Sequence, residues 1–205
     1  MKQRNLQNCG WLGVLAVIFY FLHVIVGNIL YNGYNPLTQA VSDLTANGAP
    51  SATAARILSG LYSVFVVAFS VAFYIFFRKR INSLITLGAL FFLLMHLTSA
   101  IGYTAFPLSG AGFNNTFQDR MHLAVTAIVV VLGISALLLL ATGFIKSKTH
   151  KLAGYLAIAT LLLMMSGAIV SGAVPAIFGL AERITLYSLH IYIVILAIFM
   201  LKYKF

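Results

Sequence analysis

The sequence predicts an all-α polytopic membrane protein, a bundle of six transmembrane helices with both termini in the cytoplasm. Of its 205 residues, 61% are apolar or aromatic and only 8% are charged, whereas a soluble domain carries about 25% charged residues. The mean hydropathy of +1.01 agrees with this balance. Long uncharged apolar runs and an uneven distribution of cations between the loops complete the argument. These observations exclude a water-soluble enzyme, a disordered chain and a disulfide scaffold.

Six apolar runs have the length of about 20 residues that crosses a hydrocarbon core. They predict spans at residues 11–31, 57–77, 81–106, 121–145, 152–174 and 184–201. The runs lack the two-residue alternation of barrel strands, and in lipid each span must satisfy its own backbone hydrogen bonds. We therefore expect six helices within one domain, residues 1–205.

The first span is expected to be a membrane anchor. Its apolar stretch is longer than that of a signal peptide, and no small-x-small cleavage site follows it. The next loop, "YNGYNPLTQAVSDLTANGAPSATAAR", is rich in turn-forming residues. Within it, Leu37, Val41 and Leu44 recur at spacings of four and three residues, which predicts a short helix lying against the bundle.

The cationic residues predict the orientation. Ten of the 13 Lys and Arg residues fall at the termini and in the second and fourth loops, which we expect to face the cytoplasm. The odd-numbered loops hold the other three cations and all three acids: Arg56, Arg120, Arg183, Asp43, Asp119 and Glu182. The net charge of +10 is thus mainly an insertion signal, so we expect an inner-membrane protein whose partners are lipids and not nucleic acids.

Small residues on the fifth span indicate close helix packing. In "SGAIVSG", Gly167 and Ser171 are four residues apart, and so are Ala168 and Gly172. Such a face favours contact between helices in lipid. We expect an intramolecular contact first and a homodimer through this face as the second interpretation.

Polar side chains gather in the half of the membrane that carries every acid. His96, His122 and His190 are expected to share a polar pocket there, because ionisable groups in hydrocarbon are costly unless they face the bundle interior. Asp119 and Glu182 stand at helix N-termini, where a carboxylate can be either a cap or part of a site. Since no HExxH or HxxxH pair is present, we expect no metal and no cofactor.

The motifs also resemble those of a known family. "NPLTQAVSDLTANGAP", "FP", "DRMH" and "GLAERI", spread over nearly the whole chain, are similar to motifs of the six-span prokaryotic membrane family called domain of unknown function 998. The residues that match this family's pattern are Ser42, Asp43, Pro107, His122, Gly179 and Arg183. The resemblance implies the six-span architecture and gives these residues priority as candidate site residues, but it implies no reaction.

Three functions remain in view. The leading hypothesis is an outward-facing polar pocket that binds or modifies a lipid or other amphiphile. A non-catalytic accessory or sensor protein, whose polar groups only tie the outer loops to the bundle, is the alternative. A proton-coupled transporter is third, since no span is interrupted in mid-membrane. Whether the protein is an enzyme is left open.

The leading hypothesis assigns roles to particular residues. Asp43, His122 and Arg183 are the catalytic candidates, and we expect them to meet in one pocket. Arg183 is expected to pair with a carboxylate, either Asp43 or Glu182. The ligand-binding candidates are Ser42, His96, Asp119, Arg120, Glu182 and His190.

Overall fold

The structure, a computed structural model, describes residues 3–78 and 80–203, and within them all regular secondary structure is helical. Within them no strand occurs. The helices are α1 (Gln3–Asn8), α2 (Gly10–Leu30), α3 (Ala52–Phe77), α4 (Ser83–Ala105), α5 (Phe117–Lys146), α6 (Lys151–Ala173) and α7 (Phe178–Leu201), with 3₁₀ turns η1 (Val41–Thr45) and η2 (Pro175–Ile177). Six helices are long and apolar enough to cross a membrane. The predicted all-α fold with six membrane-spanning helices is confirmed, and the cytoplasmic placement of the termini stays a prediction.

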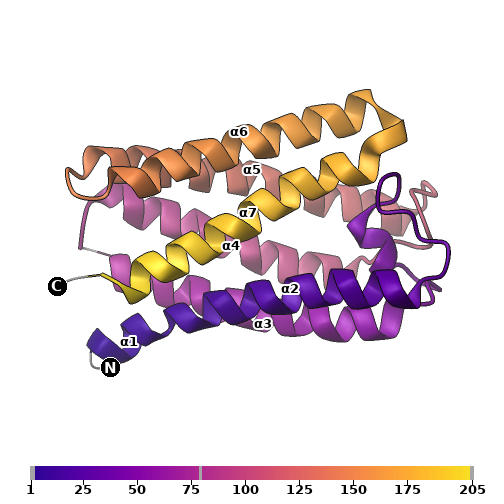
Figure 1. Cartoon of the computed structure of the whole chain (residues 1–205), viewed down its shortest axis with the longest axis horizontal. Coiled ribbons are helices and arrows are strands. Elements are labelled where there is room, and N and C mark those ends of the chain that lie inside the picture. The colour runs from indigo at the N-terminus through magenta and orange to yellow at the C-terminus, as the bar shows by residue number, and fades with distance from the viewer. Residues whose placement is uncertain (1–2, 79, 204–205) are drawn as a thin grey trace.

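The six long helices form a closed ring in chain order. Each packs against the next along the chain, and α7 returns to pack against α2. Figure 1 shows α1 and the end of α7 at one end of the bundle, with the two long loops at the other. We call residues 31–51 the cap and residues 106–116 the third loop.

Three helices begin more than one residue earlier than the apolar runs predict, and all three begin at the cap end. They start at Ala52, Phe117 and Phe178, where the sequence predicts 57, 121 and 184. An apolar run marks only the part of a helix inside hydrocarbon, whereas the helix itself continues to its N-cap. Charged residues expected in loops therefore lie within the first turns of α5 and α7.

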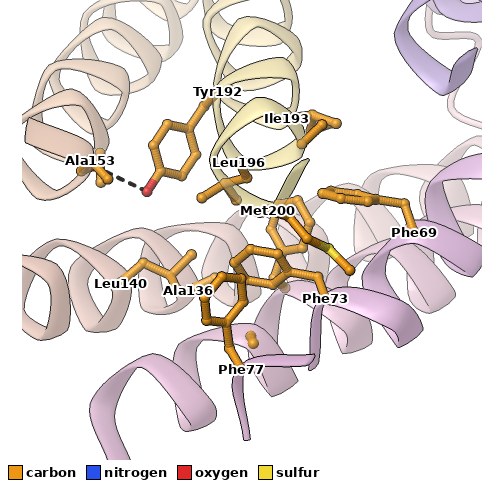
Figure 2. Packing of buried hydrophobic residues seen from close by; sticks show 14 of the residues in the cluster. Phe69, Phe73, Phe77, Ala136, Leu140, Ala153, Tyr192, Ile193, Leu196 and Met200 are labelled. Carbon is orange, nitrogen blue, oxygen red and sulfur yellow. Dashed lines mark hydrogen bonds between the residues drawn. The ribbon is translucent and has the colours of Figure 1, made fainter. Parts of the chain in front are cut away.

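Two apolar clusters make up the core. The larger lies toward the end that holds α1, and Figure 2 shows Phe69, Phe73 and Phe77 of α3 packed beside α7, with the Tyr192 hydroxyl donating to the Ala153 carbonyl oxygen at 3.3 Å. The smaller cluster lies under the cap and includes Tyr20, Val24, Tyr34, Val41, Leu44 and Ala55.

The cap contains the short helix that the sequence predicts, although only part of its expected face is buried. Val41 and Leu44 are buried in η1 and pack into the smaller cluster. Leu37 is 51% exposed, so its expected place against the bundle is wrong. The reason is that the backbone around Leu37, and not its side chain, contacts α7: the Leu180 N–H donates to the Leu37 carbonyl oxygen at 3.1 Å.

The small-residue face of α6 makes the expected intramolecular contact. Gly167 is buried against α7, where an added Cβ would lie 2.5 Å from the Ala181 carbonyl oxygen. The Thr185 hydroxyl of α7 donates to the Met164 carbonyl oxygen at 3.1 Å, which ties the helices together here. Ala168 and Gly172 of the small-residue face are exposed, and a homodimer through this face stays a prediction.

Candidate functional site

Arg183 anchors the cap to α7. This residue is buried, and its guanidinium donates to a tyrosine hydroxyl, that of Tyr34, and to three carbonyl oxygens: Pro36 at 2.7 Å, Gln39 at 3.0 Å and Gly179 at 2.8 Å. The planar guanidinium offers five N–H donors in a fixed arrangement, which suits it to collecting several acceptors at once. One side chain therefore fixes a turn of the cap against the first turns of α7.

The first two turns of α7 are shaped to receive the cap. Glu182 accepts the Val41 N–H at 2.7 Å through its Oε2 atom. Gly179 allows the close approach, since an added Cβ there would lie 2.7 Å from the Pro36 carbonyl oxygen and 2.9 Å from the Gln39 nitrogen. A glycine is needed because the neighbouring atoms are backbone and cannot move aside cheaply.

Asp43 joins the cap to the third loop. Its Oδ2 accepts the Ala40 N–H at 3.1 Å, which caps η1, and its Oδ1 accepts the Gly112 N–H at 2.8 Å. A backbone bond from the Asn47 N–H to the Leu108 carbonyl oxygen, at 2.9 Å, runs beside this link. The buried carboxylate thus stabilises contact between two loops far apart in the sequence.

Asp119 organises the third loop in the same way. It is buried in the first turn of α5, where Thr116 and Asp119 form a capping box. Its two oxygens also accept the N–H and the hydroxyl of Ser109 at 2.8 and 2.9 Å, and the Asn114 N–H at 3.0 Å. This carboxylate is therefore occupied by donors from its own loop.

His122 is the candidate histidine at the cap end of the bundle. Its Nδ1 lies 2.8 Å from the Phe106 carbonyl oxygen, and its ring lies 4.8 Å from that of Tyr103. Because a carbonyl only accepts, Nδ1 carries the hydrogen and Nε2 is left as an acceptor in the neutral ring. The side chain is only partly buried, so it is a candidate to meet an incoming molecule.

The three catalytic candidates belong to one end of the bundle, but they do not meet directly. Across residues 3–78 and 80–203, no hydrogen bond or ion pair joins Asp43, His122 and Arg183 to one another. The expected carboxylate partner of Arg183 is also wrong within this part of the chain. Carbonyl dipoles and a hydroxyl balance its charge instead, because Asp43 and Glu182 are occupied by backbone N–H groups.

The remaining ligand-binding candidates are spread over three places. Ser42 is partly buried beside Asp43, and Arg120 is exposed on α5. His96 and His190 are buried in the bundle interior, near the middle of α4 and α7. The three histidines expected to share one pocket are therefore in different places. His122 is hydrogen-bonded to the Phe106 carbonyl oxygen at the cap end, whereas His96 and His190 lie deeper in the bundle.

Sequence reasoning missed several residues that hold this end together. Arg56 of α3 donates to the Thr45 carbonyl oxygen at 2.8 Å and to Asn47 Oδ1 at 2.7 Å. Tyr34 donates to the Ala40 carbonyl oxygen at 2.6 Å while accepting from Arg183. The position of Arg56 in an odd-numbered loop was a usable signal, whereas nothing in the sequence distinguishes Tyr34 from the other nine tyrosines.

Burial changes the acidity of the cap. It raises the pKa of Tyr34 from 10.0 to about 12, although the guanidinium of Arg183 beside it works in the opposite direction. The hydroxyl is therefore kept protonated, which it must be to donate to Ala40. No group of three or more His, Cys, Asp or Glu side chains within the described part of the chain is arranged to hold a metal ion.

Open clefts occur at the opposite end of the bundle. One, of about 550 Å³, is lined by residues 81–84 and by Lys146 and Ser147. Another, of about 260 Å³, lies between α6 and α7 beside His150, whose ring is 4.9 Å from that of Phe199. Burial in this cleft lowers the pKa of His150.

Comparison with known proteins places the chain in a family. The family described as "Protein of unknown function (DUF998)" matches residues 14–198, which cover all six long helices in whole or in part. The chain belongs to this family. DUF998 membership agrees with the resemblance of the motifs and assigns no activity. No curated protein and no solved structure matches the chain.

Proposed function

We propose that this DUF998 protein is a non-catalytic membrane accessory or sensor protein whose outer charged residues hold a folded cap on the six-helix bundle. One observation carries the proposal: the side chains of Asp43, Asp119 and Glu182 accept backbone N–H groups, and Arg183 donates to backbone carbonyls. A catalytic acid or base needs an atom that can reach the substrate. These four side chains are instead occupied in holding loops.

A cap held in this way is suited to binding rather than to chemistry. It is closed underneath by apolar side chains, and its surface is built from exposed turns such as Asn32–Gly33 and Asn47–Gly48. From the distribution of cations, we propose that the cap faces outward from the inner membrane and that α1 and the end of α7 face the cytoplasm.

Amphiphile binding is a second candidate because of His122. Its side chain is partly buried at the cap end of the bundle, where Asp43 and Arg183 also lie, and its Nε2 is an acceptor. A lipid head group that carries a hydroxyl or an amine can donate to this atom. Under the amphiphile-binding hypothesis, Asp43 and Arg183 hold the cap in position and His122 contacts the head group.

Two measurements on the same variants distinguish the candidates. Under the first proposal, Asp43→Asn and Arg183→Gln lower the temperature of unfolding, while native mass spectrometry finds the same lipids bound as in the unmodified protein. Under the second, His122→Ala releases a bound amphiphile and leaves the temperature of unfolding nearly unchanged. The first proposal fails if Asp43→Asn abolishes ligand retention without any loss of stability.

A further inference from the structure

The middle of the bundle holds buried polar atoms that lack partners. Tyr20 Oη, His23 Nδ1, His96 Nε2 and His190 Nε2 make no hydrogen bond within the described part of the protein. All four residues are 5% exposed or less. A buried polar atom left without a partner costs about 1–3 kcal/mol, and native proteins have few of them. Four such atoms near the middle of the bundle helices therefore require an explanation.

Three helices, α2, α4 and α7, carry the four residues that hold these atoms. The Tyr20 ring of α2 stacks on the His190 ring of α7, with 3.4 Å between centroids and an interplanar angle of 21°. The His23 ring meets Tyr20 edge-on at 4.9 Å, and Tyr62 of α3 lies 5.2 Å from His190. His96 is buried near the middle of α4, as His190 is near the middle of α7.

The donor and acceptor roles of two members of the cluster, His190 and Tyr20, follow from their chemistry and contacts. His190 Nδ1 lies 2.6 Å from the Leu186 carbonyl oxygen and so must be the donor of that ring, which makes Nε2 an acceptor. The Tyr20 hydroxyl can both donate and accept. The cluster thus offers unsatisfied donors and acceptors at a depth where, given the positions of Tyr20 and His190 near the middle of α2 and α7, bulk water does not reach.

We propose that Tyr20, His23, His96 and His190 form an internal site, the central polar site, that binds water molecules within the bundle. Water both donates and accepts, and buried waters typically make about three hydrogen bonds to otherwise unsatisfied groups. A larger organic ligand fits less well, because the stacked rings of Tyr20 and His190 leave no space between them. Tyr20 also belongs to the apolar cluster under the cap, but the proposal does not depend on the function proposed for the cap.

The sign of one stability change tests the proposal. Tyr20→Phe keeps the stacked ring and removes only the hydroxyl. If water bonds to that hydroxyl, the variant loses a hydrogen bond and its temperature of unfolding falls by about 2–4 °C. If the site is dry, the variant loses only an unsatisfied group, and its temperature of unfolding stays the same or rises, which would overturn the proposal. Tyr192→Phe, which removes a hydroxyl bonded to Ala153, shows that the assay detects one lost bond.

A second measurement uses the unmodified chain and so does not depend on a variant that folds. In protein labelled with ¹⁵N-histidine and placed in lipid bilayers, solid-state NMR detects magnetisation transferred from water protons to ring nitrogens. We expect transfer to His23, His96 and His190, with the partly exposed His122 and His150 as positive controls. Transfer to His122 and His150 alone would show that the bundle centre is dry and would contradict the proposal.

Discussion

Replacing Arg183 with glutamine tests how firmly the cap is attached. The change removes a buried guanidinium that donates to Tyr34 and to the carbonyl oxygens of Pro36, Gln39 and Gly179. A hydrogen bond to a charged group contributes about 1.5–3 kcal/mol, but the bonds are not additive, and an exposed acceptor such as that of Pro36 regains water. We therefore expect a loss of about 3–5 kcal/mol, well below the sum of the four separate bonds.

Thermal unfolding in detergent measures this loss. A change of about 1 kcal/mol shifts the unfolding temperature of a chain of this size by roughly 2–4 °C, so Arg183→Gln is expected to lower it by roughly 6–20 °C. Arg183→Lys keeps the charge but loses the planar array of donors, so its unfolding temperature should lie between those of Arg183→Gln and the unmodified protein. Arg120→Gln is the matched control, because Arg120 is exposed at the same end of the bundle. Equal stability of Arg183→Gln and Arg120→Gln would refute the reasoning.

The other predictions concern the cap and the orientation of the bundle. The pKa of Tyr34 is about 12 in the folded protein and 10.0 in the free side chain, so the unfolded chain loses this proton at a lower pH than the folded chain. The free energy of unfolding should therefore fall as the pH rises above about 10. Tyr34→Phe should remove this part of the pH dependence of unfolding. Gly179→Ala places a Cβ against cap backbone and should cost about 1–3 kcal/mol in thermal unfolding, whereas Gly60→Ala, in open space on α3, should be neutral or stabilising. Cysteines placed in the 78–80 loop should resist impermeant thiol reagents in intact cells, and one at Asn114 should react; the reverse pattern would contradict the orientation.

The helices were predictable because their signal is long and local. A run of about 20 apolar residues predicts a span by itself, and the six predicted spans agree with the structure in number and order. The helix ends were less predictable, since the capping box of Thr116 and Asp119 extends α5 beyond its apolar run. The apolar run marks the part of the helix inside the hydrocarbon layer, whereas the capping residues determine where the helix begins.

The contacts of the polar residues were not predictable from sequence, for a physical reason. In a membrane bundle both the lipid side and the core side of a helix are apolar, so hydropathy does not show which way His122 or His190 faces. Charge alone also suggests that Arg183 should bind a carboxylate. In the folded chain its partners are carbonyl oxygens of the cap, and backbone acceptors leave no signature in the sequence.

Amide hydrogen exchange of Asp43→Ala tests the central claim most directly, namely that the outer charged residues hold the cap. Asp43 links the cap to the third loop through the Gly112 N–H. We expect exchange to become faster in both residues 31–51 and residues 106–116, and to stay unchanged in the transmembrane segments. Thr38→Ala, an exposed change in the same cap, should leave all these rates as they are. Unchanged exchange in both loops of Asp43→Ala, together with loss of a bound amphiphile, would contradict the claim.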